Sequence, residues 1–167
     1  MKGVSDVGGG IVDLVKNITV STLKGTTDIV TTGVDAAGSI VKGAISGVAD
    51  IGVAVVGTIK GIVMGTVKGF MESGGKQDEA IQGAVGQAIH SAKELGLNVG
   101  ETTVEVVKGA VEAVKEVGGD TVGATKTAVT TAVEAATEIG GETVETVKGA
   151  LSEGVDGAKK IIEEIKK

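Results

Sequence analysis

The chain contains no proline among its 167 residues, and this absence bears on every fold it can adopt. At average usage roughly eight prolines are expected in a chain of this length. Proline interrupts helices because it lacks the amide hydrogen that the helix needs and its ring clashes with the preceding turn. Nothing of this kind limits helix length here, so the sequence is compatible with very long helices.

Apolar residues recur at a helical period through the first half of the chain. Steps of three or four positions lead from Val30 to Phe70, as on one face of an α-helix. At about 100° per residue, the charged residues of this segment fall within an arc of roughly 80°. They are Lys24, Asp28, Asp35, Lys42, Asp50, Lys60 and Lys68. The pattern predicts a narrow charged ridge on a wide, weakly apolar helix.

The competing interpretation is a β-structure, because Val, Ile, Thr and Gly favour strands and turns over helices. Strict alternation of apolar and polar residues is short everywhere, however, and the charges keep a helical period. We therefore predict an all-α fold.

Short motifs repeat along the chain. Leu23-Lys24-Gly25, Val41-Lys42-Gly43 and Ile59-Lys60-Gly61 recur every 18 residues, which is five helical turns. A second echo pairs residues 117–122 with residues 139–144, at an offset of 22. Both offsets are close to whole numbers of turns, which supports the helical interpretation.

Glycines and capping residues predict where the helices end. The stretch 73–77 is predicted as a turn, and Gly96 as a left-handed helix cap. We expect helices over about 4–72, 78–95 and 101–166, arranged as an elongated, glycine-rich helical hairpin. The corresponding segments are an apolar repeat helix (1–75), a short helix and turn (76–100) and an acidic amphipathic helix (101–167).

The charge is divided unevenly between these segments. Residues 1–75 hold six lysines and six acids, whereas residues 76–167 hold ten lysines and sixteen acids. All basic residues are lysine, and Phe70 is the single aromatic residue. Without arginine forks or aromatic stacking platforms, the composition argues against nucleic-acid binding.

Few residues could carry catalysis. His90 is the only histidine, and no nucleophile or acid accompanies it at a recognisable spacing. The acids repeat as a solvated ridge rather than as a metal cluster, and Gly74-Gly75-Lys76 lacks the remainder of a phosphate-binding loop. We predict no enzymatic activity, no cofactor, no metal and no small-molecule substrate.

Gly57, Gly61, Gly65 and Gly69 are spaced by four and lie on one side of the predicted helix. Such spacing lets helices approach closely in lipid. Alternatively, these glycines leave the helix only marginally stable in water, since each costs about 1 kcal/mol relative to alanine. The sequence alone leaves both interpretations open.

The stretch from Lys24 to Asp35, followed by Val41-Lys42-Gly43, resembles the tandem amphipathic repeats of the perilipins. The Val-, Gly-, Thr- and Lys-rich repeats of the synucleins are similar in style. Residues 101–167 look more like late embryogenesis abundant proteins. The resemblance implies coating of lipid droplets or of membranes with neutral surfaces.

We therefore expect an intracellular, cytoplasmic protein that lies peripherally on a lipid droplet or membrane. Neither a signal peptide nor a membrane-spanning segment is predicted. The alternative is a homo-oligomeric subunit that assembles with copies of itself into a filament, tube or shell, and a third option is a stress-protective chain that folds on drying. The residues expected to face lipid or a partner are Val30, Val34, Val41, Ile45, Val48, Val55, Ile59, Ile62 and Phe70.

Overall fold

The computed structural model describes the backbone of residues 3–25 and 33–165, and the side chains of 10–23 and 33–165. The described residues form helices joined by turns, with no strand among them, which confirms the all-α prediction. The helices are α1 (Gly3–Gly25), α2 (Gly33–Asp50), α3 (Val56–Glu72), α4 (Gln77–Glu94), α5 (Val99–Val117), α6 (Thr121–Ile139), α7 (Thr143–Gly154) and α8 (Ala158–Ile165).

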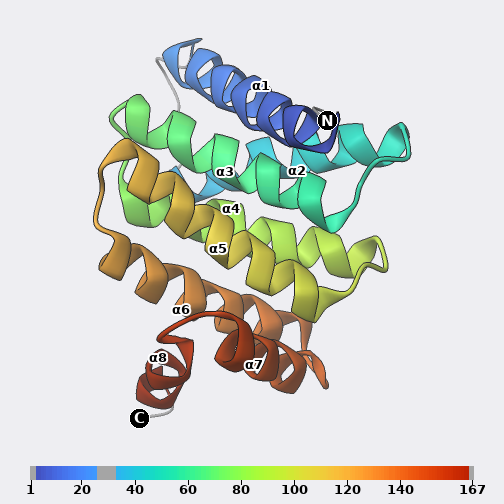
Figure 1. Ribbon diagram of the computed structural model, residues 1–167, viewed down its shortest axis with the longest axis vertical. Coiled ribbons are helices and arrows are strands. Elements are labelled where there is room, and N and C mark those ends of the chain that lie inside the picture. Colours follow the sequence, from blue (N-terminus) through green and yellow to red (C-terminus); the bar gives the residue numbers. More distant parts are fainter. Residues whose placement is uncertain (1–2, 26–32, 166–167) are drawn as a thin grey trace.

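The helices pack in two layers. The odd-numbered helices lie side by side in one layer, from α1 to α7, and the even-numbered helices form the other, from α2 to α8. Figure 1 shows the resulting stack, with α1 at one end of the longest axis and α7 and α8 at the other. Each interior helix contacts its sequence neighbours in the opposite layer and the next helix but one in its own layer.

Helices of one layer run in the same direction, as ion pairs between α3 and α5 show. The Nζ atom of Lys60 lies 3.6 Å from Oε1 of Glu105, and that of Lys68 lies 3.0 Å from Oε1 of Glu116. The lysines of the apolar first half thus face carboxylates of the acidic second half. The second half folds back on the first.

A unit of 22 residues underlies the stack. Val41, Val63, Val85, Val107 and Val129 follow one another at this spacing, each fully buried on a successive helix, and Leu151 continues the series on α7. A helix of 17 to 19 residues and a short turn make up each unit between α2 and α6. Because every unit presents the same position to the core, one apolar column runs between the layers.

The turns repeat with the same period. In the first, the amide of Gly52 donates to the carbonyl of Ala49 at 3.0 Å, and the amide of Val53 donates to that of Val48 at 2.9 Å. The same bond pair recurs at each of the next three turns, 22 residues further on each time. It requires a left-handed residue, which glycine supplies without steric cost, and the glycines at 52, 74, 96, 118 and 140 all have positive φ. Gly96 is thereby confirmed as a helix cap.

Close approach between same-layer helices accounts for several other glycines. A Cβ atom on Gly65 of α3 would lie 2.6 Å from the carbonyl oxygen of Val12 and 2.8 Å from Cβ of Val15, both on α1. Gly69 meets Thr19 of α1 in the same way, one turn further along. Of the two interpretations of the glycines spaced by four, close helix packing therefore applies at these two positions, although it occurs within the chain and not in lipid. Gly57, by contrast, lies in open space.

The predicted helix extents need correction. The helix expected over 4–72 is interrupted at 51–55, and residues 26–32 lie outside the described range. The helix expected over 101–166 is divided by turns after Val117, Ile139 and Gly154, and it begins at Val99 because Asn98 accepts a capping bond from the amide of Glu101. Without proline, glycine still ends these helices, since the left-handed turn satisfies the last carbonyls. The helix expected over 78–95 and the turn over 73–77 are confirmed to within one residue.

An elongated hairpin is not confirmed, because the chain reverses at every turn and stacks its helices in layers. The buried core is continuous from Val15 to Ile162 and draws on all three predicted segments. The division at residues 75 and 100 stays a prediction.

The close packing can be tested with two Gly→Ala substitutions. Gly65→Ala should lower the free energy of unfolding by about 1–2 kcal/mol, because α1 must move away from α3. In Gly43→Ala, whose Cβ meets no atom within 4 Å, alanine should raise it by about 0.5–1 kcal/mol through its higher helix propensity. Urea denaturation followed by circular dichroism measures both, and equal changes would contradict close packing at Gly65.

Candidate functional site

Most residues predicted to face lipid or a partner lie inside the fold. Val41, Ile45, Ile59, Ile62 and Phe70 are buried in the core. Val34 and Val48 are half-buried, Val55 is 56% exposed, and Val30 lies outside the described residues. The apolar face that the sequence predicts is thus covered by other helices of the same chain. Binding of lipid through that face would require the helices to separate.

A different set of apolar side chains is exposed near the N-terminal end of the stack. On α1, Leu14 is 59% exposed and Ile18 is 46% exposed, and half-buried Ile11 lies beside them at helical spacing. The sequence analysis missed these residues because its stripe began at Val30. The spacing of three and four from Ile11 to Leu14 and Ile18 is the signal that could have identified them. We call these three residues the α1 seam.

The turn between α2 and α3 is also apolar. Ile51 is 74% exposed, and Val53 and Val55 are exposed beside it. Two residues after the left-handed glycine, the other four turns of the repeat carry a polar residue: Lys76, Asn98, Asp120 and Glu142. This turn carries Ala54, and the helix that follows has no side-chain cap. It lies beside the N-terminal end of the stack in Figure 1.

The opposite end of the stack is polar. The exposed residues of α7, α8 and the turn between them include Glu145, Glu153, Asp156, Lys159, Lys160, Glu163 and Glu164. Ile165 is the one large apolar side chain exposed in this part of the described chain. Terminal repeats of helical stacks need such a polar outer face to remain soluble. The C-terminal end has this cap, and the α1 seam lacks it.

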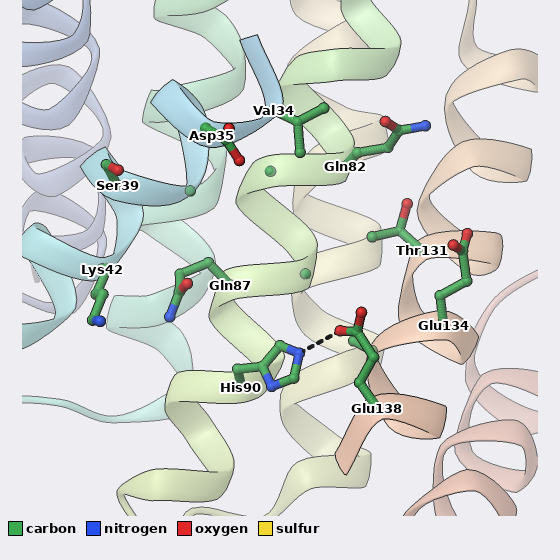
Figure 2. Close-up of a pocket in the computed structure, with 14 residues that line it drawn as sticks. Val34, Asp35, Ser39, Lys42, Gln82, Gln87, His90, Thr131, Glu134 and Glu138 are labelled. Atoms are coloured by element: carbon green, nitrogen blue, oxygen red, sulfur yellow. Dashed lines mark hydrogen bonds and ion pairs between the residues drawn. The ribbon is translucent and has the colours of Figure 1, made fainter. Parts of the chain in front are cut away.

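The largest hollow is a groove across the even layer, with a volume of about 610 Å³. Figure 2 shows that α2, α4 and α6 each contribute side chains to it. Gly38, Gly83 and Gly86 lie among its lining residues, and their missing side chains leave it hollow. Its walls are polar, whereas small-molecule sites are mostly apolar and enclose their ligand.

One ion pair spans this groove. The Nε2 atom of His90 on α4 lies 2.8 Å from Oε1 of Glu138 on α6, and both side chains reach solvent (Figure 2). The neighbouring Ser91 hydroxyl is buried and accepts a hydrogen bond from Gln87 at 3.0 Å, so it is not aligned as a nucleophile for His90. His90 and Glu138 tie two adjacent helices together.

Two further classes of site were examined by geometry. The described residues contain no group of three or more His, Asp or Glu side chains placed to hold a metal ion. Across the same ranges, none of the helices combines the length and apolar character needed to cross a membrane.

Comparisons with protein families, with curated proteins and with solved structures gave no match to this chain.

The strength of the groove's ion pair can be measured with a double-mutant cycle. We expect a coupling energy below about 1 kcal/mol between His90→Ala and Glu138→Ala, because exposed pairs are well solvated. The coupling should fall further in high salt. A coupling of several kcal/mol, measured by urea denaturation, would instead show that the pair is central to the stability of the groove.

Proposed function

We propose that this protein is a non-catalytic structural subunit that associates with copies of itself through the N-terminal end of its helical stack. The observation that carries the proposal is the contrast between the two ends. The C-terminal end is covered with charged side chains, whereas the N-terminal end exposes Leu14, Ile18 and the Ile51–Val55 turn.

The packing of α1 supports this proposal. α3 lies between α1 and α5 within its layer and also contacts α2 and α4, whereas α1 packs mainly on α3. A helix at the end of a stack therefore has a side left for a partner. Exposed apolar groups on such a side favour association, at about 25 cal/mol per Å² of apolar surface removed from water.

The proposal predicts that two serine substitutions weaken self-association. In Leu14→Ser/Ile18→Ser, the dissociation constant should rise by roughly 100-fold or more, because each pair of copies loses apolar burial at four side chains. Sedimentation velocity over a range of concentrations measures the effect.

Val122→Ser is the matched control, since Val122 is 81% exposed on α6, away from the N-terminal end. It should associate as the unsubstituted protein does. A protein that stays monomeric at all concentrations would contradict the proposal.

A second candidate function is attachment to a lipid droplet or membrane surface. The uncharged turn Ile51–Val55 favours it, because three exposed apolar side chains without a nearby capping charge suit shallow insertion into an interface. The resemblance to perilipin-type repeats points in the same direction. In this version the core stays folded and only the turn enters lipid.

Flotation with neutral phosphatidylcholine vesicles tests this candidate. Ile51→Ser/Val53→Ser/Val55→Ser should abolish flotation if the turn inserts, because each buried aliphatic side chain contributes about 1.5–3 kcal/mol. Leu95→Ser serves as the control, as Leu95 is an exposed apolar residue of a turn that also contains Asn98. Flotation that survives the triple substitution would assign lipid binding to another surface.

A further inference from the structure

The shape of the α1 seam distinguishes between possible partners. On the helix, Ile11, Leu14 and Ile18 span an arc of roughly 60° at 100° per residue. A helix that lies on lipid presents a wider apolar arc, of at least about 100°, opposite a lysine-rich face. A narrow strip at three-four spacing is the pattern by which one helix packs on another. The seam therefore fits a helix better than a lipid surface.

Charge then selects which helix of a second copy can cover the seam. From residue 10 to residue 23, α1 carries only Asp13 and Lys16, and Nζ of Lys16 lies 3.6 Å from Glu72 of α3. The far end of the stack carries charges of both signs on α7 and α8, and burying these against Leu14 and Ile18 would remove them from water without partners. The surface of a second copy that matches the nearly uncharged seam is the seam itself.

We propose that two copies pair head to head, with the α1 seam of one packed antiparallel against the α1 seam of the other. Leu14 then faces Ile18 of the second copy. The two Asp13 residues are offset by about 9 Å along the helices, at 1.5 Å per residue. The added helix continues the odd layer beyond α1, on the side of α1 away from α3. This inference rests on the proposed self-association and specifies its geometry.

Such a contact is isologous, so it closes after two copies. A head-to-tail contact would instead repeat from copy to copy and build a filament. The seam thus predicts a dimer with its two polar C-terminal ends pointing outward.

The chain contains no cysteine, so a single introduced cysteine reports on one position only. Asn17 is exposed beside the middle of the seam, and Ser152 is exposed on α7. With a short bismaleimide, Asn17→Cys should form cross-linked dimers, and Ser152→Cys should not. Adding Leu14→Ser to Asn17→Cys should lower the yield by roughly tenfold, the effect of losing one buried side chain. Thermal unfolding followed by circular dichroism checks that each variant is folded.

Each other outcome would overturn the pairing in a different way. Cross-linking between Asn17→Cys and Ser152→Cys in a mixture of the two proteins would show a head-to-tail contact. Sedimentation as oligomers without any cross-link at Asn17 would leave self-association standing and place it elsewhere. Monomers at every concentration would remove both proposals. Flotation of Asn17→Cys with phosphatidylcholine vesicles, without cross-linking in their absence, would assign the seam to lipid.

Discussion

The close approach of parallel helices within each layer is the constraint on which the rest of the structure depends. At Gly65 and Gly69, backbone and side-chain atoms of α1 occupy the space that a Cβ would need. Short side chains such as Val and Ala can then fill the narrow space between the layers without large aromatic residues. The composition that looks too small for a packed core is therefore suited to this one, in which helices rather than side chains bring the surfaces together.

The helical class and part of the helix boundaries could be predicted from the sequence, because periodicity and capping residues are local signals. Gln77–Glu94 and the cap at Gly96 are examples. The layered arrangement was missed because the 18-residue spacing of Lys-Gly motifs implied one continuous helix. The spacing of 22 from Val41 to Val129, and of the glycines from 52 to 140, carries the true unit. Only a turn that reverses the chain makes that spacing meaningful, and the sequence shows the turn glycines without their φ angles.

The site was harder to predict for a related reason. Val41 and Ile59 form an apolar stripe whether lipid, a second copy or the same chain covers them, since periodicity gives the direction of a face but not its partner. In the structure the partner is the chain itself. What is left exposed is set by the position of a helix in the stack: Leu14 and Ile18 are exposed because no further helix of the chain covers that side of α1.

The restriction of contacts to helices one or two units away also has a consequence for how such chains can change length. Each unit contacts partners about 22 or 44 residues away, so no contact links the two ends of the stack. Duplication or loss of two consecutive units would preserve both layers and every remaining interface. In such a molecule the distance between the N-terminal seam and the charged C-terminal cap is an adjustable dimension, set by the number of units and independent of the surfaces at either end.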